Sequence, residues 1–149
     1  MDRRRFSTLL LALPPLAIAT QVEAARGKGG SMSDAAAAAS IVSQIRARYG
    51  HGPVTIDPRM SAAAAHQARA VAQLGWLSHG DFAGRVRQFG LRGSMAENLA
   101  YGSNDVGGAI AQWQNSSSHM ANLLKPGATR MGLGRADSRS TRYWAMVIG

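Results

Sequence analysis

The chain has 149 residues, no cysteines and a formal net charge of +9 at pH 7. Without cysteines it cannot be a disulfide-stabilised scaffold, so the fold must depend on its own hydrophobic core. The positive charge favours acidic partners, but the arginines are mostly isolated and lack the interleaved aromatic residues of a nucleic-acid stacking surface. We therefore expect no nucleic-acid partner.

Residues 1–24 have the features of a secretory signal peptide. Three arginines (residues 3–5) precede an apolar run over residues 9–19, and residues 22–24 (VEA) have the small-x-small form that a signal peptidase accepts. The run is too short to span a bilayer, so we expect no transmembrane segment in the mature chain. The arginines followed by Phe6 also fit the looser twin-arginine pattern, which leaves both export routes open.

Removal of these 24 residues from 149 leaves 125, which suits one domain. The leader holds three arginines, Asp2 and Glu23, a net of +1, so the mature chain keeps +8 of the +9. We expect a periplasmic or secreted protein. Its positive charge has two interpretations: a solvated surface that keeps the chain soluble, or a contact with an anionic lipid or polymer of the cell envelope.

A flexible, glycine-rich linker is predicted over residues 25–33, followed by a single domain over residues 34–149. Ser33 or Asp34 can cap the first predicted helix, which ends at Gly50.

A second helix is predicted from Pro58, with Asp57 as its cap, to Gly75. Its many alanines allow the close approach of a sheet or another helix. A short helix is predicted within residues 81–90.

The second half of the chain mixes shorter elements. Residues 97–102 predict a strand or the end of a loop, and residues 105–116 predict a helix weakened by two glycines, each costing about 1 kcal/mol. Residues 119–127 predict one or two helical turns stopped by a proline.

The C-terminal residues favour β-structure. Residues 130–136 and 141–149 alternate or run apolar and are rich in β-formers, so they predict two strands joined by residues 137–140. Helices first and strands last indicate an α+β domain with helices packed on an antiparallel sheet.

Glu97 is the only glutamate of the predicted mature chain, and it lies among apolar residues. A carboxylate there is costly unless it is paired. His79 and His119 are candidate partners, and two histidines with a glutamate can bind zinc and leave a position open for water. Their spacings of 18 and 22 residues from Glu97 match no local metal motif. A purely structural interpretation, in which Glu97 accepts hydrogen bonds and joins loops, therefore stays open.

Ser116, Ser117 and Ser118 directly precede His119, but adjacent helical residues do not face each other and no G-x-S-x-G segment is present. We interpret the serines as a helix cap. Asp81 is the acid nearest to His79 in sequence, and we expect it to cap the short helix that follows.

Four segments fall in the order and spacing of the CAP superfamily, and the match runs from about residue 40 to residue 149. They are LSHGDFAGRV (77–86), AENLAYG (96–102), AQWQNSSSHMANLLKPGATRMGLG (111–134) and RYWAMVIG (142–149). The chain thus resembles the cysteine-rich secretory, antigen 5 and pathogenesis-related proteins, and in particular the bacterial SCP-like extracellular domains. The resemblance implies an α-β-α sandwich around a small antiparallel sheet.

The resemblance also implies a central cavity with two histidines and two acidic residues. His79, Glu97 and His119 match three of these positions and are the implied metal ligands, with zinc as the candidate ion. The second acidic residue should follow Trp113, where this chain has Gln114.

Two functions are compatible with these residues. The first, which we favour, is an exported, non-enzymatic binding domain whose His/Glu cleft holds a divalent metal ion or an envelope ligand. The alternative is a zinc-dependent hydrolase of the cell envelope, with His79 and His119 on the metal and Glu97 as third ligand or general base.

Overall fold

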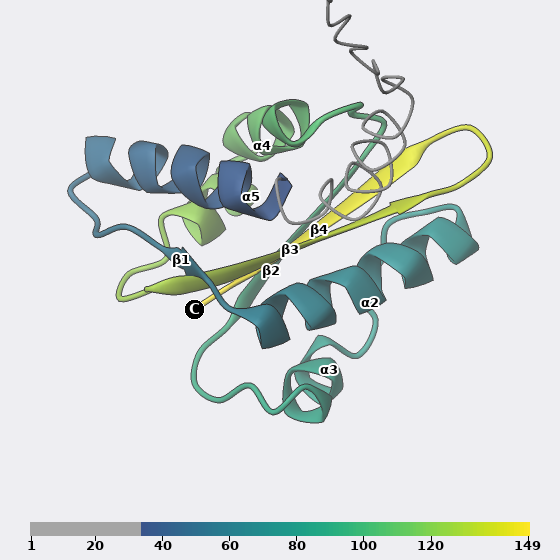
Figure 1. The fold of residues 1–149 in the computed structure, drawn as a ribbon, viewed down its shortest axis with the longest axis horizontal. Coiled ribbons are helices and arrows are strands. Elements are labelled where there is room, and N and C mark those ends of the chain that lie inside the picture. The colour runs from purple at the N-terminus through teal and green to yellow at the C-terminus, as the bar shows by residue number, and fades with distance from the viewer. Residues whose placement is uncertain (1–33) are drawn as a thin grey trace, which may run out of the picture.

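The computed structural model describes residues 34–149, so the predicted signal peptide, the linker and the possible cap Ser33 lie outside it. Helices cover both faces of a four-stranded sheet (Figure 1). This confirms the α+β class and the α-β-α sandwich. In residues 34–149 no helix combines the length and apolar character needed to cross a membrane.

The sheet has the order β1-β3-β4-β2. Its strands are β1 (Thr55–Ile56), β2 (Ala96–Tyr101), β3 (Arg130–Asp137) and β4 (Arg142–Ile148). β2, β4 and β3 are antiparallel neighbours, as expected, whereas β1 pairs in parallel with β3 and makes the sheet mixed. β1 was not predicted, because two residues are too few to show an alternating pattern.

Five helices are present in the described residues. They comprise residues 34–48, α2 (Pro58–Leu74), α3 (Phe82–Gln88), α4 (Val106–Gln114) and α5 (Ser117–Leu123). The helix of residues 34–48 lies with α4 and α5 on one face of the sheet, and α2 lies with α3 on the other (Figure 1). All five match predicted helical segments within a few residues.

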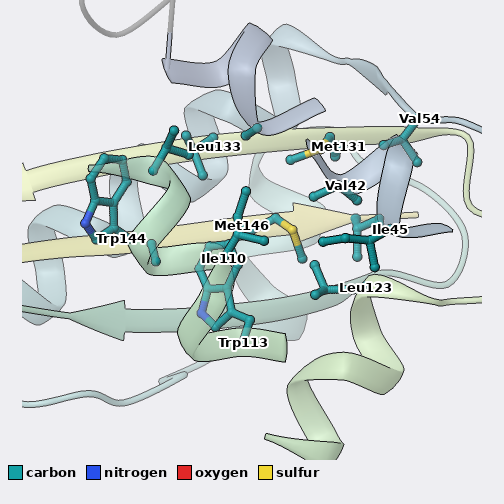
Figure 2. Packing of buried hydrophobic residues seen from close by; sticks show 14 of the residues in the cluster. Val42, Ile45, Val54, Ile110, Trp113, Leu123, Met131, Leu133, Trp144 and Met146 are labelled. Atoms are coloured by element: carbon teal, nitrogen blue, oxygen red, sulfur yellow. The ribbon is translucent and has the colours of Figure 1, made fainter. Parts of the chain in front are cut away.

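β4 is buried on both of its faces. Trp144, Met146 and Ile148 pack on the side of α4 and α5, while the alternate residues pack on the side of α2. Figure 2 shows Trp144 and Met146 beside the side chains of α4. The two-sided burial explains why this strand reads as a continuous apolar run.

β3 places its glycines against α2. A Cβ atom built on Gly132 would lie 2.1 Å from the backbone carbon of Met60, and one on Gly134 would lie 2.2 Å from the backbone nitrogen of Ala65. The alternate residue Leu133 is in the opposite core (Figure 2). The alanine-rich α2 therefore does have the close partner that its composition predicts, and that partner is the glycine face of β3.

Gly134→Ala is expected to lower the free energy of unfolding by about 2–3 kcal/mol, because α2 must move away to admit the methyl group. Urea denaturation measures this. The control is Gly107→Ala in α4, where Gly107 is exposed and the nearest atom to an added Cβ is Asp105 Oδ1 at 3.4 Å. There alanine should be neutral or should stabilise by up to about 1 kcal/mol. Equal effects of the two substitutions would contradict the close packing of α2.

Asp57 caps α2, as predicted. Its Oδ1 accepts hydrogen bonds from the backbone nitrogens of Arg59 (2.8 Å) and Met60 (3.3 Å), and its Oδ2 accepts from Arg130 Nη1 (2.7 Å). Burial by itself would raise the pKa of this carboxyl, but the backbone hydrogen bonds and the charges of Arg130 and Arg59 outweigh it and hold the pKa below its ordinary value.

Asp57→Ala should cost about 1–2 kcal/mol of stability at pH 7. Because the folded-state pKa of Asp57 is depressed, its ionised form stabilises the fold above the unfolded value of about 3.9. This contribution is lost as the pH falls through the lower, folded-state pKa. Denaturation curves at pH 7 and in acid should therefore show the wild type and variant converging as the pH drops. A difference that stays constant or grows in acid would contradict this role.

The prediction that a serine caps α5 is confirmed in position but is wrong about the capping hydrogen bond. Ser116 holds the N-cap position, but its side chain makes no capping hydrogen bond, and its Oγ lies 3.2 Å from Ser118 Oγ. The neighbouring hydroxyl competes with the backbone for the same short side chain.

Candidate functional site

The Glu97 carboxylate is 1% exposed, and both of its oxygens have partners. Oε1 lies 2.8 Å from His79 Nδ1, and Oε2 accepts a hydrogen bond from Arg85 Nη2 at 2.6 Å. Glu97 comes from β2, Arg85 from α3, and His79 from the segment that joins α2 to α3. The structure thus places His79 beside Glu97, and Arg85 compensates the buried negative charge of Glu97.

Arg85 is the site residue that sequence reasoning missed. Its side chain is 6% exposed and also donates to the backbone oxygen of His79 at 3.2 Å. The guanidinium carbon lies 5.5 Å from the ring centroid of Phe82. Arg85 follows Phe82 by three residues, and this spacing, which places both on one helical face, was the available signal. Its Nε is buried and has no hydrogen-bond partner in the described part of the chain, so Glu97 is its main anchor.

His119 lies on α5, which packs on the opposite face of the sheet from α3. Its backbone oxygen accepts a hydrogen bond from Asn98 Nδ2 at 3.0 Å. No hydrogen bond or ion pair joins its imidazole to Glu97 within residues 34–149. Burial, and then the charge of His79, lower the pKa of His119. The expected convergence of both imidazoles on Glu97 is therefore seen for His79, while His119 lies close enough to be influenced by the His79 charge.

The outer edge of β2 is covered by polar side chains from α4 and α5. Three of them donate to alternate backbone oxygens of the strand: Asn122 Nδ2 to Glu97 (3.2 Å), Trp113 Nε1 to Leu99 (3.0 Å) and Gln112 Nε2 to Tyr101 (3.1 Å). Such cover prevents an edge strand from pairing with another chain. These contacts give Gln112, Trp113 and Asn122 of the 111–134 segment a structural role, which is to cover the edge of β2.

Asp81 caps α3, as predicted, because its Oδ1 accepts from the backbone nitrogen of Gly84 at 2.7 Å. Gln114, at the position where the resemblance implies a second acid, is exposed. Across residues 34–149, no group of three or more histidine, aspartate and glutamate side chains is arranged to hold a metal ion. Metal binding by His79, Glu97 and His119 together therefore stays a prediction.

The sequence profile described as "CAP: Cysteine-rich secretory protein family" matches residues 39–148. The chain belongs to the CAP family. The match covers α3, β2 and α5, which hold Arg85, Glu97 and His119, and also the connecting segment that holds His79.

Comparisons with individual proteins agree with this. The protein YkwD of Bacillus subtilis is 28% identical over 101 residues, which are 64% of this chain and 39% of YkwD. Among solved structures, an extracellular SCP-domain protein of Bacillus anthracis superimposes with a TM-score of 0.72 at 20% identity, covering 79% of this chain and 40% of that one. An outer surface protein of Borrelia burgdorferi gives a TM-score of 0.66 at 19% identity, covering 74% and 86%. This CAP chain thus spans about two-fifths of the length of the two Bacillus proteins, and the solved structures support its fold.

Proposed function

We propose that the chain is an exported, non-enzymatic binding domain that presents His79 to a divalent metal ion or an envelope ligand. Three features support export to the periplasm or the exterior: the signal-like residues 1–24, and the extracellular and outer-surface descriptions of two structural relatives.

The observation that carries the proposal is the contact between His79 Nδ1 and Glu97 Oε1 at 2.8 Å. It fixes the orientation of the ring and leaves Nε2 available on a side chain that is 55% exposed. A carboxylate that holds one imidazole nitrogen is a common support for a metal-binding histidine. In this proposal His79 and His119 are the zinc ligands, and Glu97 holds His79 and does not touch the ion.

The same contacts argue against the hydrolase alternative. A general base needs a carboxylate oxygen within reach of the attacking water, but Arg85 and His79 occupy both oxygens of Glu97. Asp81 is engaged as the cap of α3. If the protein hydrolyses generic peptide or ester substrates, and if a chelator abolishes this activity, the hydrolase is supported and a non-enzymatic binding role is contradicted.

Calorimetric titration with Zn²⁺ tests the metal-binding form of the proposal. Saturable binding is expected in the wild type and should be lost in His79→Ala and in His119→Ala. Glu97→Gln should weaken the affinity by about 10–100-fold, the usual effect of removing a group that orients a metal ligand.

His66→Ala is the matched control for this titration. His66 is exposed on α2 and packs edge-on against Phe89, with ring centroids 5.7 Å apart. Its loss should leave zinc affinity unchanged. Absence of heat in the wild type, or an equal loss in His66→Ala, would exclude the proposed zinc site and leave only the envelope-ligand form of the proposal.

A further inference from the structure

A pocket of about 510 Å³ lies between the loop that precedes β2 and the turn that follows α5. Its lining is residues 92–95, residues 125–130 and Gly149. None of these residues belongs to the His79–Glu97–Arg85 cluster, so the pocket is a separate feature of the molecule.

Three cationic side chains line this pocket: Arg92 from the loop that precedes β2, and Lys125 and Arg130 from the segment that follows α5. Lys125 Nζ donates to Ser94 Oγ at 2.7 Å, which fixes the ammonium at the pocket wall and leaves two of its N–H groups available. Arg130 is 42% exposed and is held through Nη1 by Asp57. Arg92 is exposed and has no ion-pair partner within residues 34–149.

Two acceptors near the pocket are already engaged, the carboxylate of Asp57 and the backbone oxygen of Gly149. Asp57 neutralises one of the three cations through its contact with Arg130. The backbone oxygen of Gly149 accepts hydrogen bonds from the backbone nitrogens of Thr129 (3.2 Å) and Arg130 (3.0 Å). The side chains of the pocket therefore carry an excess of donors and positive charge, and a complementary ligand must supply negative oxygens.

We propose that this pocket binds a phosphate group. Guanidinium and ammonium groups that line one pocket suit a tetrahedral oxyanion with several acceptor oxygens, through charge-assisted hydrogen bonds. The Ser94 hydroxyl adds a donor beside Lys125. This site is independent of the metal site in the proposed function, so the failure of one leaves the other intact.

Titration with inorganic phosphate, followed by calorimetry and by the amide NMR signals of Gly93 and Ser94, tests the proposal. Saturable binding is expected, and Arg92→Gln combined with Lys125→Gln should weaken it at least tenfold. The matched control combines Arg48→Gln with Arg139→Gln, which removes the same charge from two exposed positions outside the pocket. At physiological ionic strength, where charges beyond about 8 Å are screened, the control should change the affinity less than twofold.

The proposal is overturned if the wild type shows no saturable phosphate binding, or if the two double variants lose phosphate affinity equally. It is also overturned if phosphate binds without shifting the Gly93 and Ser94 signals, which would make it an adventitious ion only. Vesicles with and without anionic phospholipid identify the source of the phosphate. If the protein is retained on anionic vesicles, if inorganic phosphate releases it, and if the Arg92→Gln, Lys125→Gln variant is not retained, the ligand is a lipid headgroup. Phosphate binding without vesicle retention assigns a soluble phosphate compound.

Discussion

Replacing Arg85 with methionine is expected to lower the free energy of unfolding by about 3–5 kcal/mol, the usual cost of removing one member of a buried ion pair. Glu97 is 1% exposed and would keep a buried charge with only His79 beside it. Urea denaturation at neutral pH measures the effect. Arg87→Met is the control, because Arg87 lies in the same helix but is exposed.

The double variant Arg85→Met, Glu97→Leu separates pairing from packing. Apolar residues that replace both members of a buried pair are often neutral or stabilising, so the double variant should be more stable than Arg85→Met alone. If the two single substitutions are instead additive, Arg85 and Glu97 do not interact in solution. An Arg85→Met variant as stable as Arg87→Met would contradict the pairing directly.

Arg46→Met is also expected to cost about 3 kcal/mol or more. Arg46 is 1% exposed and has no carboxylate partner; its guanidinium donates to four backbone oxygens, those of Gly52 (2.8 Å), Leu123 (2.9 Å), Lys125 (3.0 Å) and Ala128 (3.0 Å). Two of these hydrogen bonds are fully buried, and each unsatisfied buried acceptor costs about 1–3 kcal/mol.

The charge of Arg46 suits its position. Burial lowers the pKa of the guanidinium, but an arginine stays protonated in proteins, and the oxygens of Leu123 and Lys125 lie at the negative end of α5. Arg48→Met is the control, since Arg48 lies two residues along the same helix and is exposed. Thermal denaturation should show a large loss for position 46 and little change for position 48. Equal melting temperatures would exclude Arg46 as the residue that joins these loops.

The candidate site was predictable in part. Glu97 is an isolated glutamate among apolar residues, which indicates a buried and partnered carboxylate, and His79 is indeed its neighbour. Arg85 was not predicted, because an arginine in a short helix is more often on a solvated face than buried. His119 lies beside β2 on the opposite face of the sheet from α3. This position depends on the order of the strands, which cannot be predicted from local sequence patterns.

The sequence by itself determined the features that depend on near neighbours. Asp57 and Pro58 set the start of α2, the alanines of that helix predicted a close partner, and the apolar runs near the C-terminus specified β3 and β4. These follow from capping, side-chain size and periodicity, which act over a few residues.

Only the tertiary structure decided which arginines are buried. Arg46 reaches carbonyl oxygens 77 to 82 residues away in sequence, and Arg85 and Glu97 come from separate elements. A long cationic side chain enters the interior only when acceptors from distant segments are in place to compensate for the water it loses. The packing of the helices on the sheet brings those acceptors together. Their proximity is therefore a property of the fold and cannot be predicted from a local sequence pattern.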